Sequence, residues 1–127
     1  MFKLVKCENG ISDGIAQMLE ELGEPPQVLT HDSPRPLVVH REMGQMTLVV
    51  RGAGLAHLAG RTVALAAGDL LILTPGCKHS FAAVGGDLHL RHWHWPQALL
   101  NEDRSVLQDD VDFGPVAAAP DLDGNLP

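Results

Sequence analysis

The chain has 127 residues, which suffices for one domain but leaves too little apolar surface for two separate hydrophobic cores. Its formal net charge of −7, from 16 acidic side chains against 9 Lys and Arg, lacks the clustered cations that phosphate binding requires, so we expect no direct nucleic-acid binding. The 45% hydrophobic and 20% charged shares are those of a globular protein and exclude wholesale disorder.

Cysteine usage and hydropathy favour a soluble cytoplasmic protein with no membrane partner. Cys7 and Cys77 form no CxxC pair and suggest no disulfide framework, which fits a reducing compartment. No stretch approaches the ~18 uninterrupted apolar residues of a membrane span. The N-terminus also lacks a long apolar run followed by a small-residue cleavage site.

A short amphipathic helix is predicted near the N-terminus. Between Ile11 and Leu22, apolar residues recur at three- and four-residue spacing, at Ile15, Met18, Leu19 and Leu22. Gly23 supplies a stop, and Pro25-Pro26 forbids helix beyond it. This helix and the turn-rich stretch that follows form an expected N-terminal arm, residues 1–36.

From residue 37 the pattern changes to short β-type runs separated by glycine. Many short strands with Gly-bearing turns indicate a sandwich or barrel rather than alternating β and α units. Ala59-Gly60 is a plausible hairpin turn, because glycine accepts positive φ. The predicted strands are Leu37 to Met43, Met46 to Arg51, Leu55 to Leu58, Thr62 to Leu65, Leu70 to Thr74, His79 to Ala83 and Leu88 to Trp95.

After Pro96 the strand pattern ends. Gln97 to Leu107 could form a helix, and the Ala-, Pro-, Asp- and Gly-containing stretch to Pro127 is typical of an extended surface segment. The expected organisation is therefore the arm, a barrel core over residues 37–96, and a C-terminal tail over residues 97–127.

The segment from Gly68 to His79 carries the stronger of two motifs. A Gly68-Asp69 turn opens an apolar strand, Pro75-Gly76 reverses the chain, and His79 begins the returning strand. This arrangement resembles the second motif of the cupin superfamily, with Thr74 where the family usually has proline and Ala83 where it often has Asn. The turn places His79 so that we expect it to face the barrel interior.

The segment from His40 to Gly52 resembles the first cupin motif less completely. Aligned on Gly52, Gln45 falls where the family usually has Glu, His40 takes the place of its second histidine, and Val38 that of its first. Loss of these two metal ligands implies weakened metal binding. Together the motifs imply an all-β fold, a double-stranded β-helix or small jelly roll, with a short N-terminal helix before it.

A narrower resemblance spans Val49 to Gly54 and Leu88 to Pro96. These runs are similar to the sugar-sensing barrel of AraC-type transcription regulators. In that family the barrel binds a small effector and helps the protein to dimerise, whereas a separate helix-turn-helix region contacts DNA. The resemblance implies a sensor-like module that binds a small molecule, with sugars as one candidate class. It also implies a homodimer, and we expect no room for a DNA-binding region after Trp95.

The strand from Leu88 to Trp95 leaves one question open. Residues two apart in a strand share a face, so either His92 and His94 or Trp93 and Trp95 point inward. Large aromatics usually take the buried side. If the histidines point inward instead, they converge with His40 and His79.

Two sets of site residues follow, and no catalytic residue is assigned. A small ligand would contact His40, Gln45, His79 and Trp93, which describes a non-enzymatic binding module. A divalent transition metal would be held by His40, His79 and His94, or by Gln45 in place of His94. The metal set would describe a cupin enzyme, an isomerase or a dioxygenase. A closed barrel with no ligand is the third alternative.

Overall fold

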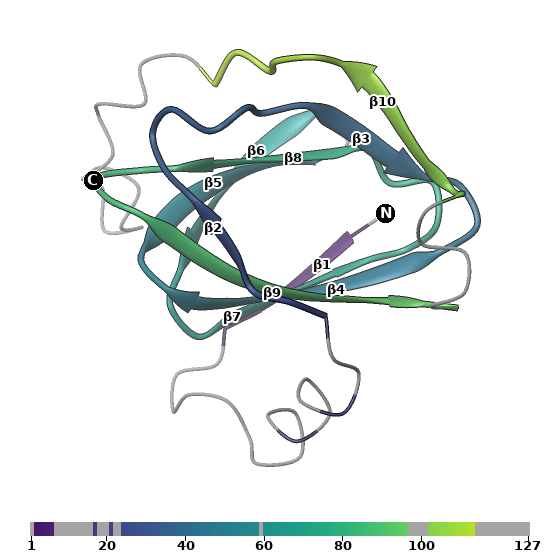
Figure 1. Cartoon of the computed structure of the whole chain (residues 1–127), viewed down its shortest axis with the longest axis horizontal. Coiled ribbons are helices and arrows are strands. Elements are labelled where there is room, and N and C mark those ends of the chain that lie inside the picture. Colours follow the sequence, from purple (N-terminus) through teal and green to yellow (C-terminus); the bar gives the residue numbers. More distant parts are fainter. Residues whose placement is uncertain are drawn as a thin grey trace.

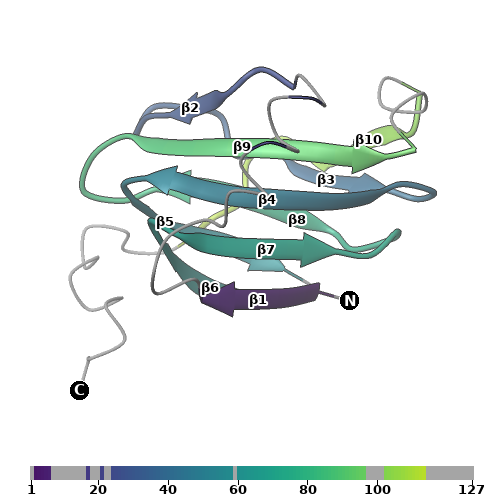
Figure 2. The same cartoon turned by 90° about the horizontal axis from the view of Figure 1, so that it is seen from below.

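The computed structural model describes residues 2–6, 17, 21, 24–58, 60–96 and 102–113. Two antiparallel sheets face each other and enclose the interior (Figure 1), and the view from below shows one sheet lying in front of the other (Figure 2). This nearly all-β architecture confirms the predicted fold class. Within the described residues, no helix is long and apolar enough to cross a membrane.

Among the described residues each sheet has five strands, and all of their pairings are antiparallel. In spatial order the first sheet contains β1 (Phe2–Lys6), β7 (Asp69–Leu73), β4 (Gly44–Arg51), β9 (Leu88–Trp95) and β2 (Gln27–Leu29). The second contains β10 (Arg104–Gln108), β3 (Leu37–His40), β8 (His79–Ala83), β5 (Ala53–Leu58) and β6 (Arg61–Ala66).

The space between the sheets is apolar at one end and polar at the other. Along the inward face of β9, buried Leu88 and Leu90 are followed by His92 and His94. Strands β4 and β8 make the same change, from Val49 to Thr47 and Gln45, and from Ala83 to His79. The apolar end supplies the core, where each fully buried leucine contributes ~1.5–3 kcal/mol relative to an exposed one. The polar end is left for a site.

The outer face of the first sheet carries a second apolar cluster. Leu48, Leu70 and Trp93 are buried there, with Val5 and Met46 packed against them. This cluster gives Trp93 a buried environment that does not lie between the sheets. The tryptophan is therefore buried although the histidines on either side of it point inward.

The strand predictions differ from the structure mainly at element ends. Strands β8 and β9 have the predicted bounds, whereas the first predicted strand ends at His40 rather than Met43. The predicted turns hold Gly60 at φ 84° and Gly76 at φ 88°, the left-handed region that glycine tolerates. Strands β1, β2 and β10 were not predicted, because these short segments do not show an alternation of apolar and polar residues between two turn signals.

Of the two predicted helices, one is partly contradicted by the structure and the other lies mostly outside the described residues. The helix considered for Gln97 to Leu107 is wrong from Arg104 onward, because that stretch forms β10, which pairs with β3 as an edge strand of the second sheet. The helix predicted between Ile11 and Leu22 lies outside the described residues except for Gln17 and Glu21. These two residues have helical backbone, and Gln17 Nε2 donates a hydrogen bond to Glu21 Oε1 over 3.1 Å.

Candidate functional site

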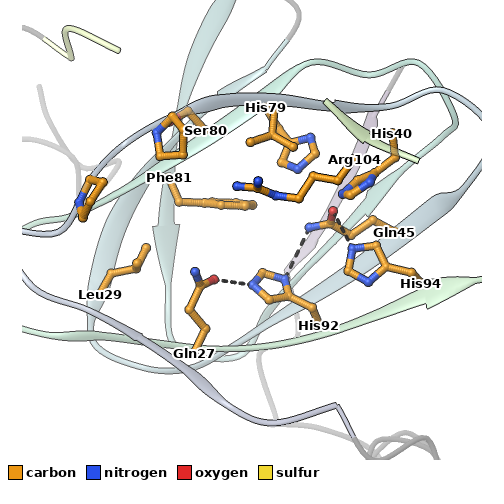
Figure 3. Close-up of a pocket in the computed structure, with 13 residues that line it drawn as sticks. Gln27, Leu29, His40, Gln45, His79, Ser80, Phe81, His92, His94 and Arg104 are labelled. Atoms are coloured by element: carbon orange, nitrogen blue, oxygen red, sulfur yellow. Dashed lines mark hydrogen bonds between the residues drawn. The ribbon is translucent and has the colours of Figure 1, made fainter. Parts of the chain in front are cut away.

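A cavity of about 210 Å³ lies at the polar end, between the two sheets. Figure 3 shows side chains from both sheets pointing into it. Its polar wall consists of His40, Gln45, His79, His92, His94 and Arg104, and Gln27 closes it beside His92. The apolar part of its lining consists of Leu29, Pro34, Pro36, Val38 and Phe81, and Ser80 also lines it, with a buried Oγ that has no hydrogen-bond partner among the described residues.

Most of the residues predicted for the site meet in this cavity. His40, Gln45, His79 and His94 all line it, although they come from β3, β4, β8 and β9. Trp93 does not line it, because its side chain is on the opposite face of β9 in the outer cluster. His92, which was considered but assigned to neither set, does line it.

A chain of hydrogen bonds fixes the protons on His92. Gln45 Nε2 donates to Thr47 Oγ1 over 2.9 Å, which leaves the Thr47 hydroxyl free to donate to His92 Nδ1 over 2.7 Å. The other ring nitrogen, Nε2, lies 2.6 Å from Gln27 Oε1, an atom that can only accept. His92 is therefore held neutral, with its proton on Nε2.

His94 has a partner at each ring nitrogen. Its Nε2 lies 3.0 Å from Gln45 Oε1 and therefore donates, while its Nδ1 lies 3.1 Å from Glu24 Oε1. Both Glu24 and His94 are about nine-tenths buried. Burial raises the pKa of the Glu24 carboxyl to about 6 and lowers the pKa of His94 to about 4.

His40 and His79 have ring atoms that the protein leaves unused. His79 Nδ1 lies 3.0 Å from the Cys77 carbonyl oxygen and donates to it, and no described residue bonds its Nε2. His40 Nδ1 is buried with no hydrogen-bond partner among the described residues. The His40 ring centroid lies 5.5 Å from that of His79 and 4.8 Å from that of His94. His79 Nε2 is therefore available to a ligand, whereas the unpartnered His40 Nδ1 is itself buried.

The pocket histidines are neutral at pH 7. Burial lowers the pKa of His40 from 6.5 to about 4, and His94 and Arg104 add to this effect. Burial likewise lowers the pKa of His79 to about 4, against the opposing effect of its hydrogen bond to Cys77. For His92, burial and then the nearby His94 lower the pKa to about 3. Arg104 is consequently the one positively charged side chain that lines the pocket within the described residues.

The residues as placed do not fit the metal centre considered from the sequence. A ligating imidazole must offer a free lone pair, but both ring nitrogens of His94 are engaged with Glu24 and Gln45. In the part of the chain that the structure describes, no three His, Cys, Asp or Glu side chains are grouped so as to hold a metal ion. His40 and His79 supply only two imidazoles.

Sequence reasoning missed Gln27, Glu24 and Arg104. Gln27 and Arg104 lie on the short edge strands β2 and β10, and Glu24 precedes β2. Glu24 and Gln27 are 70 and 65 residues from their histidine partners in the chain. No local motif marks such pairings, because only the sheet register brings them together.

A family model, the AraC-like ligand binding domain, matches residues 39–112. The chain belongs to this family. The matched region contains His40 at its start and Arg104 near its end, so it includes most of the pocket. The resemblance to the AraC-type barrel is thereby confirmed, and so is ligand binding as the general role of the domain.

Solved structures similar to this AraC-like ligand binding domain share its fold. A Klebsiella pneumoniae protein with a double-stranded β-helix domain has a TM-score of 0.57 and 17% identity, covering 69% of this chain and 92% of that one. A cupin-like protein from Thermotoga maritima has a TM-score of 0.55 and 20% identity, covering 87% and 77%. These likenesses confirm the cupin fold.

An enzyme of known activity is also among the similar structures. A single-residue mutant of salicylate 1,2-dioxygenase from Pseudoaminobacter salicylatoxidans has a TM-score of 0.51 and 13% identity. The match covers 74% of this chain but 36% of the dioxygenase, so it concerns a part of that enzyme. No curated protein sequence matches this chain.

Proposed function

We propose that this AraC-like ligand binding domain is a non-enzymatic, sensor-like module that holds a small polar molecule between its sheets. The observation that carries the proposal is the pocket itself, where polar side chains converge on a cavity with an opposite apolar wall. Ligand pockets characteristically combine an apolar lining with a few placed polar groups. Sugars are one candidate class of ligand.

The histidine network supports binding rather than catalysis. His92 and His94 have both ring nitrogens bonded to protein partners. Neither ring therefore has a free nitrogen that could exchange a proton with a substrate. His79 keeps Nε2 available, and that atom would make a directional hydrogen bond to a ligand. The proposed contact residues are His79 through this atom, and His40 and Gln45 as neighbouring side chains of the same lining.

The test compares His79→Ala with His31→Ala in thermal-shift titrations against a panel of sugars and divalent metals. His31 is a matched control because its side chain is 86% exposed in the turn before β3. We expect a ligand response that His79→Ala removes and His31→Ala keeps. His79→Gln, which retains bulk and polarity, separates loss of binding from loss of folding. Equal responses in both alanine variants would contradict the proposed site.

The alternative function is a metal-dependent cupin enzyme. The presence of His40, His79 and Gln45 in one pocket supports this alternative. It would require His94 or Gln45 to release its present partner. Elemental analysis of the purified protein decides between the two functions. A stoichiometric transition metal, lost in His79→Ala, would favour the enzyme, and its absence would favour the binding module.

We also propose that the domain forms a homodimer and works in the cytoplasm. Edge strand β10 exposes Val106 and Leu107, which are 45% and 43% accessible, and a second copy would cover them. The buried free thiol of Cys77 is consistent with a reducing compartment. Light scattering across a dilution series should give the dimer mass. A monomer at every concentration would contradict the dimer.

A further inference from the structure

We propose that the ligand of this pocket is a small monocarboxylate with an apolar body, bound with its carboxylate against Arg104. The inference rests on the proposed binding function and adds to it the chemical class of the ligand. It depends on two features of the pocket: one cation with no ion-pair partner among the described residues, and a set of apolar side chains in the same lining.

The cation is the first feature. Arg104 extends from β10 as an exposed residue that lines the cavity, and Figure 3 shows its side chain passing His40 with the guanidinium reaching toward Phe81. No carboxylate in the described part of the chain forms an ion pair with it. Its chain neighbour Asp103 is occupied elsewhere, because both carboxylate oxygens accept backbone N–H groups of the turn after β3. The guanidinium is therefore available to an anion.

The anchoring of Asp103 also positions Arg104. The Asp103 carboxylate accepts hydrogen bonds from the N–H groups of Arg41, Glu42 and Met43 over 3.1, 2.9 and 2.8 Å. These bonds tie the start of β10 to the turn that leads into β4. Arg104, the next residue, is thereby fixed at the rim of the cavity.

The charge balance selects a carboxylate with one negative charge. A guanidinium presents its N–H donors in a planar fork that matches the two oxygens of a carboxylate. The pocket histidines are neutral, so Arg104 offsets a single charge, and a dianion would bring a second charge without a partner.

The remaining wall fits an apolar body. Leu29, Val38 and Phe81 line the cavity together with Pro34 and Pro36, and the Phe81 ring lies 5.8 Å from the rings of His79 and His92. Hydroxyl groups placed against these apolar side chains would lose hydrogen bonds to water, and Ser80 Oγ is the one unpartnered hydroxyl of the lining among the described residues. The cavity of about 210 Å³ is smaller than the ~300–1,000 Å³ of sites for drug-sized ligands. A single ring or a short chain carrying one carboxylate therefore satisfies both the size and the polarity.

The experiment is a backbone-amide NMR titration with benzoate and its neutral isostere benzamide, which have the same shape but differ in charge. We expect benzoate to bind at least tenfold more tightly than benzamide. Arg104→Gln should weaken benzoate at least tenfold and leave benzamide unchanged. Arg51→Gln, the same charge change at an exposed position outside the cavity, should leave both unchanged.

Two further arms separate this inference from the binding function on which it rests. Inorganic phosphate binding more tightly than benzoate would overturn the assignment to carboxylates. Equal affinity for benzoate and benzamide, or no binding of either benzoate or hexanoate, would overturn the inference. If the carboxylate results are negative but sugars bind and His79→Ala removes sugar binding, the proposed binding function is supported and only the assignment of a carboxylate ligand is wrong. If neither sugars nor carboxylates bind, the proposed function fails as well.

Discussion

His94 Nε2 donates a hydrogen bond to Gln45 Oε1 over 3.0 Å, between two residues that are register partners on β9 and β4. The Gln45 amide therefore joins the two histidines of β9, since its Nε2 lies 3.3 Å from His92 Nδ1. One buried side chain orients both rings. The sequence marks Gln45 as the residue at a position where the cupin motif usually has Glu.

Gln45→Leu should destabilise the protein by about 1–3 kcal/mol, because His94 and Thr47 would lose a buried hydrogen-bond partner. The free energy of unfolding in urea measures the change. Gln17→Leu, which alters an exposed amide, is the matched control and should change stability by no more than about 0.5 kcal/mol. A Gln45→Leu variant as stable as the native chain would show that the network does not hold the pocket together.

The pocket histidines should make stability fall as the pH drops from about 6.5 to about 4. The folded-state pKa values of His40, His79 and His92 are lowered to about 4, 4 and 3. In this window the unfolded chain binds protons that the folded protein does not, so protonation favours unfolding. Above pH 6.5 the contribution is fully present. Urea unfolding at several pH values measures the slope.

His92→Gln tests the origin of that slope. Glutamine can keep the bonds to Thr47 and Gln27 but does not titrate, so the slope should decrease by up to about 1.4 kcal/mol per pH unit, the value for one proton. His31→Gln removes an exposed histidine and gives the control slope. An unchanged slope in His92→Gln would mean that other groups cause the acid sensitivity.

Trp93→Phe should lower stability without changing ligand affinity. Trp93 is 4% exposed and packs with Leu48 and Leu70 on the outer face of the first sheet, so the smaller ring leaves a gap there. We expect a loss of about 1–3 kcal/mol and a dissociation constant for the bound ligand within about twofold of the native value. Calorimetric titration of the folded variant provides the check. A dissociation constant tenfold larger than that of the native protein would indicate that Trp93 contacts the ligand after all.

Gly52→Ala should destabilise the protein more than Gly60→Ala does. Both glycines have positive φ, 89° and 84°, so alanine is strained by ~1–2 kcal/mol at either position. At Gly52 a Cβ would also meet the Asp87 carbonyl oxygen at 2.1 Å, whereas nothing lies within 4 Å at Gly60. The extra cost at Gly52 is on the order of 1–3 kcal/mol. Thermal unfolding of the two variants, compared side by side, decides the order.

The sequence by itself determined the all-β fold and the turns that shape it. Gly76 occupies the predicted reversal, and β8 begins at His79 as expected, because a Pro-Gly turn between apolar runs is a local signal. The motif resemblance also placed His40, Gln45 and His79 at one site, and all three line the cavity. Local patterns were sufficient for each of these inferences.

Only the tertiary structure decided which face of β9 is the inner one. Alternation places His92 and His94 together but gives no preference between the two sides. The choice depends on the outer cluster around Leu48 and Leu70, which buries Trp93 without using the interior. Arg104 reached the pocket in the same way, through the pairing of β10 with β3. Arg104 and its register partner His40 are 64 positions apart in the chain, and sheet register, rather than any local propensity, brings them together.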